Sequence, residues 1–482
     1  MRAIRAWLMI AASVPAAAFA QGIRISGVTT MQLVELRPLM IDSLPSSQVP
    51  GTGEIRTSAD GVPAICPTGS PFCQFERSGN RFSVAPVLQD LTIAGWGLSE
   101  GLSFHSDLRA RTQIGGSGDF VFPRTNDHFD VVDAYAQLDR SDWSARVGRQ
   151  WVTGGLGAYG FDGGDGIWRH NAFTTEGWAG RALVGGLAEP YTTGLLAAVD
   201  NLPPQQDGYV FGARARYRPD ALTAATLTYQ RILVGDRSGL YSERAAFDAS
   251  SRQFGAAIDL GAAYDFATAG WNEARLRVGT GGERTLGYSV EARHSRPYFE
   301  LWTIWGAFSP VGFDEGRATI DWRPQSSAFS YSLHGGYRKY GETNAGISLV
   351  TNGWRVGADV NWRGTGRTSA SGSYDVDVGT GASSTDARAG MRWAPSADVS
   401  FGADATITQT IYEFRVGTGR IYGLAGDAAF PLKPDVRLVA DLGVYQHSLT
   451  NGAAGPDWTQ RRASIRLEWM LGGDPGTGAK LP

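Results

Sequence analysis

The sequence is poor in cysteine and in charge. Two cysteines in 482 residues cannot build a disulfide framework. Charged side chains make up only 19% of the chain and the net charge is −3, which gives no basic surface for nucleic acid. Beyond the N-terminal segment, no run of about 18 consecutive apolar residues occurs. We therefore expect neither a nucleic-acid partner nor a helical membrane span.

Signatures of catalysis and of cofactor binding are missing as well. The six histidines are scattered, and there is no nucleotide loop, zinc signature, nucleophile elbow or C-x-x-C-H haem motif. His447-Ser448 resembles half of a hydrolase site, but a strand end that runs into a loop explains this pair more simply. We expect no enzyme, no catalytic residue, no cofactor and no resident metal.

The N-terminus has the features of a secretory signal. Arg2 and Arg5 precede an apolar stretch, and Ala18-Phe19-Ala20 is a typical cleavage motif. Residues 1–20 are therefore predicted to be a signal peptide that is removed after Ala20. An exported chain without a helical span is expected in the periplasm, the exterior or the outer membrane.

What the chain does contain is alternation at period two, clearest in the stretch Gly208–Gln230. One face holds small residues between aromatic ones: Tyr209, Phe211, Ala213, Ala215 and Tyr217. The other face is cationic: Val210, Gly212, Arg214, Arg216 and Arg218. Pro219-Asp220 marks a turn, and Thr223–Gln230 alternates again. Successive side chains of a strand point to opposite faces, so the pattern predicts a hairpin with one apolar and one polar face.

Repetition of this unit through the chain is typical of a transmembrane β-barrel, in which the apolar face meets lipid and aromatic girdles mark the interfaces. Trp354 and Trp362 stand at the two ends of one apolar face. Eight residue steps span about 26 Å, or about 20 Å of height at a tilt of about 40°. We predict an all-β fold, a single closed antiparallel barrel of about 22 strands (range about 20–24), with no plug domain.

The expected boundaries follow from the breaks in the alternation. The barrel is predicted to span residues 21–470, and residues 471–482 to form a periplasmic tail. Prolines after aromatic residues, as in Trp322-Arg323-Pro324, Trp393-Ala394-Pro395 and Phe430-Pro431, mark short turns. Longer breaks predict extracellular loops near 40–80, 115–127, 153–172, 234–250, 339–352 and 448–458.

The 40–80 loop contains both cysteines, spaced C-x6-C in a segment rich in proline and glycine. In an oxidising compartment this spacing predicts a local disulfide, Cys66–Cys73. A metal pair is the alternative, but no histidine lies nearby.

A short motif gives a family resemblance. Gly148-Arg149-Gln150 followed by Phe161-Asp162-Gly163 resembles the GRQ…FDG signature of porin-like outer-membrane barrels. These include alginate-export-type porins and the porins that sheathe multihaem cytochromes. Arg149 breaks the local alternation, and we expect a bulge at Gly148 to turn it inward. The intervening TGGLGAYGFDGGDG is expected to be a flexible glycine loop that could fold into the lumen.

The alternation of side chains along each strand, called parity below, predicts that a set of charged residues lines the lumen: Arg146, Arg149, Arg214, Arg216, Arg218, Arg275, Arg277, Arg293, Arg355, Asp359, Arg388, Arg392, Arg437 and Asp441. Two interpretations stay open. The arginines could create a field that favours anions, or they could pair across strands with interleaved acids and keep a wide interior solvated.

The leading functional hypothesis is a porin-like channel in the bacterial outer membrane. It would sit in outer-membrane lipid and pass small hydrophilic solutes, anions among them. The alternative is a barrel that sheathes or scaffolds a periplasmic or lumen-inserted partner, such as a multihaem cytochrome, because barrels of about 22 strands are normally plugged.

Overall fold

The computed structural model describes residues 22–37, 39–57, 63–115, 128–183, 208–234, 240–280, 285–296, 312–341, 351–364, 366–379, 382–413, 417–449 and 457–472. The predicted signal peptide lies outside these ranges. So do residues 473–482 of the predicted tail and much of the predicted loops near 115–127, 339–352 and 448–458. None of the described residues forms a helix long and apolar enough to cross a membrane.

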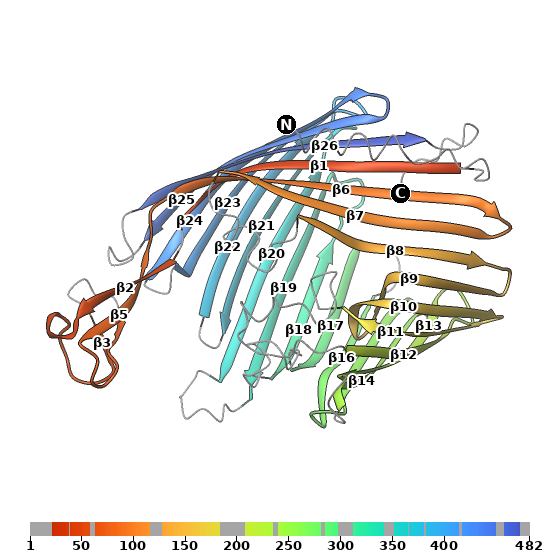
Figure 1. The fold of residues 1–482 in the computed structure, drawn as a ribbon, viewed down its shortest axis with the longest axis horizontal. Coiled ribbons are helices and arrows are strands. Elements are labelled where there is room, and N and C mark those ends of the chain that lie inside the picture. The colour runs from red at the N-terminus through yellow and green to blue at the C-terminus, as the bar shows by residue number, and fades with distance from the viewer. Residues whose placement is uncertain are drawn as a thin grey trace.

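The main sheet closes on itself (Figure 1). Each strand pairs antiparallel with its neighbour along the chain, and the first strand, β1, pairs with both β6 and β26. The result is a 22-stranded ring, and the described residues contain no plug domain. The predicted closed antiparallel barrel of about 22 strands is thereby confirmed.

The bounds of the barrel strands are β1 (Gly22–Leu36), β6 (Phe82–Ser99), β7 (Leu102–Ile114), β8 (Phe129–Asp139), β9 (Trp143–Gly154), β10 (Gly157–His170), β11 (Phe173–Ala182), β12 (Gly208–Tyr217), β13 (Thr223–Val234), β14 (Leu240–Gln253), β15 (Ala256–Asp265), β16 (Gly270–Thr280), β17 (Leu286–Ser295), β18 (Phe313–Trp322), β19 (Phe329–Tyr340), β20 (Asn352–Arg363), β21 (Thr368–Gly379), β22 (Ala382–Trp393), β23 (Ser400–Glu413), β24 (Gly417–Lys433), β25 (Val436–Leu449) and β26 (Trp458–Gly472).

Contacts between strands that are not adjacent identify the inner face of the ring. Arg355 on β20 lies 2.8 Å from Glu315 on β18 (Nη2–Oε1), and Arg338 on β19 lies 3.0 Å from Asp377 on β21 (Nη1–Oδ1). Side chains converge on the concave side of a closed sheet and diverge on its convex side. These charged residues therefore stand on the inner face, and by alternation the apolar residues between them stand on the outer face.

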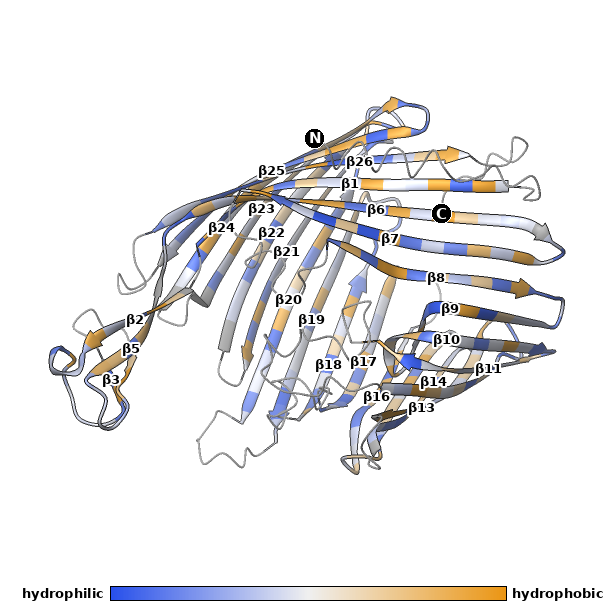
Figure 2. Ribbon diagram, in the orientation of Figure 1, coloured by the Kyte–Doolittle hydropathy of each residue, from blue (hydrophilic) through white to orange (hydrophobic). Residues whose placement is uncertain are grey.

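Hydrophilic and hydrophobic residues alternate along the barrel strands (Figure 2), and the apolar ones on the outer face are exposed. Its large exposed side chains include Val147 (69%), Leu227 (55%), Val290 (60%), Leu424 (65%) and Leu442 (68%). Contact of such a large apolar surface with water would be unfavourable, so its exposure indicates an apolar environment around the barrel.

Aromatic pairs border this belt at the end of the barrel where the connections are short. Ring centroids lie 4.7 Å apart in Phe173–Tyr217, 5.3 Å in Trp322–Tyr331 and 5.5 Å in Trp393–Phe401. At the opposite end Tyr337 and Trp354 face each other across β19 and β20. Two aromatic borders are what a barrel with two membrane interfaces requires.

The segment expected to be an irregular loop at 40–80 carries a small sheet that projects from one end of the barrel (Figure 1). Its strands are β2 (Leu39–Pro45), β3 (Ile55–Thr57), β4 (Pro63–Ile65) and β5 (Phe72–Ser78), and the 3-10 turn η1 (Ser46–Gln48) follows β2. Short strands broken by proline and glycine give too few alternating residues to be recognised in the sequence.

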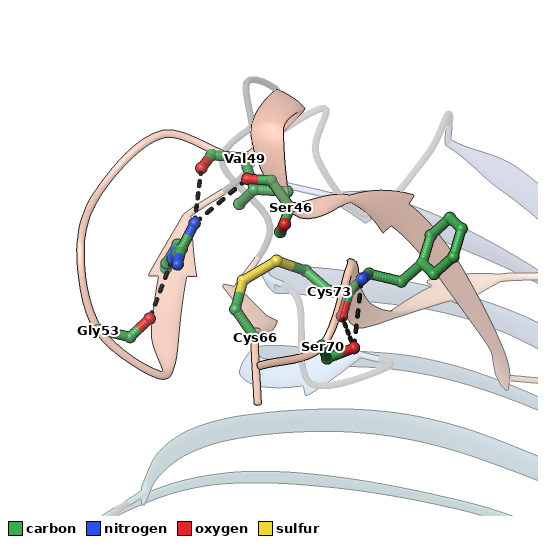
Figure 3. The surroundings of a disulfide bond; sticks show 8 residues. Ser46, Val49, Gly53, Cys66, Ser70 and Cys73 are labelled. Carbon is green, nitrogen blue, oxygen red and sulfur yellow. Dashed lines mark hydrogen bonds between the residues drawn. A yellow bond between two sulfur atoms is a disulfide. The ribbon is translucent and has the colours of Figure 1, made fainter. Parts of the chain in front are cut away.

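Cys66 and Cys73 are joined by a disulfide inside this small sheet (Figure 3), with their Cα atoms 4.1 Å apart. The sulfurs pack with Val49 and Ala64 in a small buried cluster. Arg56 donates from Nε to the Gly53 carbonyl oxygen (2.9 Å) and from Nη1 to the Ser46 carbonyl oxygen (3.2 Å). The bridge and the arginine thus hold a segment whose apolar core is very small.

Three expectations about connections are wrong, and the first is the loop near 234–250, because β14 already begins at Leu240. The glycine run TGGLGAYGFDGGDG is no long loop: β9 ends at Gly154 and β10 begins at Gly157. Its glycines permit close backbone approach, since a Cβ on Gly163 would lie 2.1 Å from the Ala179 carbonyl oxygen. Pro431 does not end its strand, because β24 continues to Lys433 across a register shift that accommodates the missing N–H.

Candidate functional site: the inner face of the barrel

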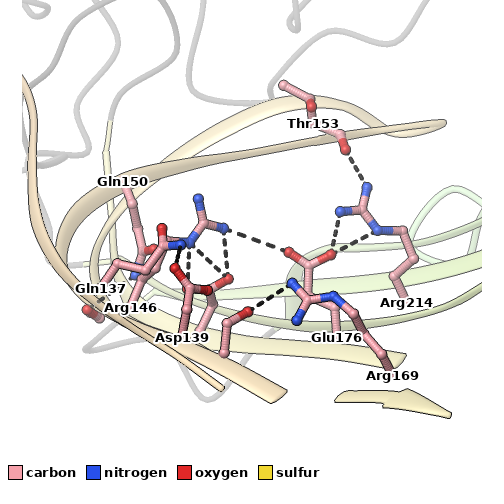
Figure 4. A network of polar contacts seen from close by, with 11 residues as sticks. Gln137, Asp139, Arg146, Gln150, Thr153, Arg169, Glu176 and Arg214 are labelled. Carbon is pink, nitrogen blue, oxygen red and sulfur yellow. Dashed lines mark hydrogen bonds and ion pairs between the residues drawn. The ribbon is translucent and has the colours of Figure 1, made fainter. Parts of the chain in front are cut away.

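The charged residues of the inner face are organised in networks, and the first crosses β9 to β12 (Figure 4). Arg146 donates two hydrogen bonds to Asp165, from Nε to Oδ1 at 2.9 Å and from Nη2 to Oδ2 at 2.6 Å. It also lies 3.8 Å from Glu176. Arg214 donates to the same Glu176 and to the Thr153 carbonyl oxygen. The Asp165 and Glu176 side chains are 1% and 6% exposed. Carboxylates this buried need the two guanidinium groups, so Arg146 and Arg214 have structural partners.

A second network joins β18 to β21. Glu315, with a side chain only 2% exposed, accepts from Arg338 (Nε, 3.0 Å) and lies 2.8 Å from Arg355. Arg338 also reaches Asp377 at 3.0 Å. Each partner is a charged group held on a rigid strand, which gives the wall fixed alternating charge and leaves little free positive charge here.

Other predicted arginines have weaker or more exposed partners. Arg392 pairs with Asp427 at 2.5 Å and with Asp404 at 3.3 Å, and its side chain is 55% exposed. Arg293 lies 3.8 Å from Glu273, and Arg437 lies 4.0 Å from Glu468. Exposed pairs of this kind contribute little to stability, but each of these arginines has a carboxylate beside it and adds little unpaired positive charge to the wall. Of the predicted acids, Asp359 lies 3.8 Å from His334, and Asp441 accepts from Ser464 at 2.6 Å.

A third group of arginines makes no close ion pair within the described part of the chain: Arg216, Arg218, Arg275, Arg277 and Arg388, of which Arg275 still interacts electrostatically with Asp248. Arg216 and Arg388 stand exposed on the inner face, and Arg277 donates to the Ser289 hydroxyl at 3.3 Å. Arg218 follows β12 and lies in the short turn. Positive charge on this wall is therefore concentrated at a few positions rather than spread over every inner arginine.

Arg149 does not join this face. The ladders of β9 with β8 and with β10 run through Gly148 without a register shift, so the expected bulge is wrong. Arg149 then stands on the same face as Val147, the outer one, where it pairs with Asp162 at 2.7 Å (Nε–Oδ1) and 2.9 Å (Nη2–Oδ2). The charge is compensated by its cross-strand partner, and no inward turn is needed.

The end of the β9–β10 hairpin folds over the inner face. Arg244 on β14 donates to the Leu156 carbonyl oxygen (3.1 Å) and to the Tyr159 hydroxyl (2.5 Å). Leu156 packs on Ala246 and Ala263, which belong to β14 and β15. The hairpin end thus lies four or more strands away from its own position in the ring. A contact between strands that are well separated in a closed ring has to run through the interior of the ring. The hairpin end therefore occupies part of the lumen and reduces its width.

An apolar cluster fills the space behind the hairpin end. Val152, Phe161, Trp178, Val210 and Ile232 are all nearly inaccessible to solvent and pack together, with Tyr159 at the edge. Val210 and Ile232 alternate with polar inner-face residues, so parity places them toward the lumen, where polar neighbours would be expected. The alternation predicts the face of a residue but does not reveal that the chain folds back to cover it.

Several residues of this site are absent from the expected set: Asp165, Glu176, Arg244, Glu315 and Arg338. Asp165 lies in the glycine run, Arg244 lies in the segment expected to be the loop near 234–250, and Glu176, Glu315 and Arg338 lie in strands to which the sequence analysis assigns no face. The alternation of FTTEGWAGRA and of FDEGRATIDW would place Glu176 and Glu315 on polar faces. Their pairing with particular arginines depends on strand register, which parity does not supply.

These observations define a closed antiparallel β-barrel with an apolar outer face and a polar, partly narrowed inner face. No protein-family model matches the chain, and no curated protein matches its sequence. Among solved structures, OccAB1 of Acinetobacter baumannii is 10% identical and matches over 95% of this chain and 98% of its own, with a TM-score of 0.43. OccAB2 of the same organism is 9% identical over 95% and 99%, with a TM-score of 0.40.

The OmpF structure of Salmonella typhi, solved in complex with daunomycin, is 8% identical and matches over 63% of this chain and 100% of its own, with a TM-score of 0.34. These neighbours are outer-membrane porins. Identities of 10% or less and TM-scores below 0.5 carry nothing about function. The fold of this chain rests on its own strand register.

Proposed function

We propose that the chain is a porin-like channel in the bacterial outer membrane, secreted by a signal peptide cleaved after Ala20, that passes small hydrophilic solutes without energy input. The observation that carries the proposal is the closed ring with an apolar outer face and a charged inner face. A continuous apolar belt suits lipid, and a polar interior suits water and dissolved solutes. The β9–β10 hairpin end supports a loop-narrowed channel rather than a sheath, because it occupies part of the space a partner would need.

Within this function, we propose that anions are favoured. The exposed inner-face arginines Arg216 and Arg388 have no carboxylate partner among the described residues. Unpaired positive charge on the wall of a water-filled passage raises the local concentration of anions, because the low-dielectric wall focuses the field into the water. The paired arginines Arg146, Arg214, Arg338 and Arg355 contribute mainly to the strength and shape of the wall.

The test is the electrical behaviour of the purified protein. The untagged barrel is inserted into a planar bilayer under a KCl gradient, and single-channel conductance and reversal potential are recorded. Stepwise insertion with stable conductance, and a reversal potential on the anion side, are expected. A correctly assembled barrel that conducts nothing would overturn the channel, while conductance with a cation-side potential would overturn only the anion preference.

A further inference from the structure

Three possible metal ligands meet on the inner face of β7 and β8. His105 and Asp107 belong to β7, and Asp133 belongs to β8. His105 Nε2 lies 3.3 Å from Asp107 Oδ2 and 3.3 Å from Asp133 Oδ1. One ligand atom from each of the three residues lies within 4.8 Å of the others. The three side chains are partly exposed, so the cluster is open to the lumen.

A positive charge would stabilise this cluster. Asp107 and Asp133 stand directly opposite each other in the ladder, and like charges at such positions repel. Among the described residues, His105 is the sole basic side chain that pairs with either of them. Its Nε2 carries at most one hydrogen, and this hydrogen can be donated to one carboxylate only. The Asp133 Oδ1 atom is buried and accepts no hydrogen bond within the described part of the chain.

Two of the three distances in the cluster match those of a metal site. Two ligands held at about 2.05 Å from a tetrahedral Zn²⁺ are separated by about 3.3 Å. Both distances from His105 Nε2 have this value, and the two carboxylate oxygens lie within 4.8 Å of each other. Thr92 donates its hydroxyl hydrogen to the other oxygen of Asp107, Oδ1, at 2.5 Å. This bond orients Asp107 with Oδ2 toward the histidine, as outer partners of metal ligands do.

Another histidine of the inner face shows the contrasting arrangement. His334 Nε2 lies 3.0 Å from Asp375, and its other nitrogen, Nδ1, lies 3.8 Å from Asp359. The two carboxylates therefore stand on opposite sides of the imidazole ring and cannot reach one ion together with a single nitrogen. His334, like His105, has two aspartates beside its imidazole ring, but these aspartates do not approach the same ring nitrogen. His334 therefore provides a matched control.

We propose that His105 Nε2, Asp107 Oδ2 and Asp133 Oδ1 bind a divalent transition metal ion on the wall of the lumen. One imidazole and two carboxylates are a suitable ligand set for Zn²⁺ and its neighbours in the first transition row, and are less suited to Mg²⁺ or Ca²⁺, which prefer oxygen alone. Since three protein ligands leave a coordination position free, a water molecule or a passing anion can bind the ion from the lumen. This differs from the sequence-based expectation of no resident metal.

The experiment is calorimetric titration of the untagged, detergent-solubilised barrel with Zn²⁺ after chelator treatment. Saturable binding of one Zn²⁺ per chain is expected in the wild-type protein and in His334→Ala. His105→Ala and Asp133→Asn should lose this binding. Thr92→Val, which keeps the three ligands but removes the orienting hydroxyl, should weaken it about tenfold or more. Heat-modifiable migration on a gel verifies that each variant is an assembled barrel.

Three other results would overturn the proposed metal site. Absence of saturable Zn²⁺ binding in the wild-type protein would overturn the site. So would binding that survives His105→Ala and Asp133→Asn, or binding that His334→Ala removes. If one ligand variant does not assemble, the other ligand variant and Thr92→Val still decide the question. Calorimetry does not depend on conduction, so the metal site and the channel can fail separately.

Discussion

Arg149 and Asp162 face each other across β9 and β10 on the outer face of the barrel and form a two-point ion pair of 2.7 and 2.9 Å. Arg149 Nη1 also donates to the Val131 carbonyl oxygen at 3.1 Å. A lone charge on a lipid-facing surface is costly, but a guanidinium that is bonded to a carboxylate at two points presents little net charge to its surroundings. The pair therefore makes an otherwise unfavourable outer-face position acceptable.

This pairing predicts a strong dependence of each partner on the other. Asp162→Ala leaves Arg149 uncompensated, and we expect a loss of about 2 kcal/mol in the free energy of unfolding. The double variant Asp162→Ala with Arg149→Ala should recover most of this loss, because it removes both charges. Urea unfolding in a double-mutant cycle measures the coupling. Additive effects of the two single changes would contradict the ion pair.

The assignment of faces can be tested on the β12–β13 hairpin. Ala215→Arg places a charge on the outer face, and we expect it to destabilise the barrel by about 2–4 kcal/mol if the position is near the bilayer midplane. Thr226→Arg places the same charge on the inner face, opposite Asp248 in the ladder, and should assemble normally. Folding yield by heat-modifiable migration is the measurement. Equal assembly of the two variants would contradict the assignment.

The same hairpin shows which features of the barrel can be predicted from the sequence alone. Period-two alternation was sufficient to predict the closed barrel, the strand number and the two faces, because these depend on which residues are apolar. It could not predict that Gly212 lies beneath Trp178, where a Cβ would be 2.4 Å from the indole ring. Parity alone would present Gly212 as an open lumen position. Packing of this kind depends on the shape of neighbouring strands.

The ion pairs show a second limit. Parity places Arg214 and Arg216 side by side as equal members of a cationic row. In the folded barrel Arg214 holds the buried Glu176, whereas Arg216 has no ion-pair partner among the described residues. The difference arises from register, which brings Glu176 opposite Arg214 and Thr174 opposite Arg216. The sequence therefore predicts the inner wall but does not separate its structural arginines from its free ones.

Removal of the disulfide should affect only the small projecting sheet. Cys66→Ser with Cys73→Ser opens a short ring, and the loop-entropy model gives a loss of roughly 2–3 kcal/mol for that sheet. The barrel makes its hydrogen bonds independently of β2–β5, so assembly and conductance are expected to stay unchanged. Limited proteolysis should cut the variant faster between residues 39 and 78. Failure of the variant to assemble would show that the small sheet is needed for barrel folding.

The hairpin end at Leu156 should control the width of the passage. Leu156 is buried against Ala246 and Ala263, and truncation of a buried leucine to alanine costs about 2–5 kcal/mol. In Leu156→Ala this loss weakens the attachment of the hairpin end to the wall, so we expect additional, larger conductance levels in single-channel records. Leu227→Ala, an equal truncation at an exposed outer position, is the control and should leave the conductance unchanged. Identical records for the two variants would mean that the hairpin end does not narrow the passage.

The free arginines should set ion preference while the paired ones do not. Arg216→Gln with Arg388→Gln removes two exposed inner-face charges that have no ion-pair partner in the described part of the chain. Because no carboxylate is left uncompensated, assembly should be retained, and the reversal potential in a KCl gradient should move toward cations. The control is Arg218→Gln with Arg323→Gln, which removes equal charge from two short turns outside the strands. If the control shifts the reversal potential as much as the test variant, net charge rather than position governs selectivity. If neither double variant shifts the reversal potential, the inner-face arginines stabilise the barrel wall and do not determine ion selectivity.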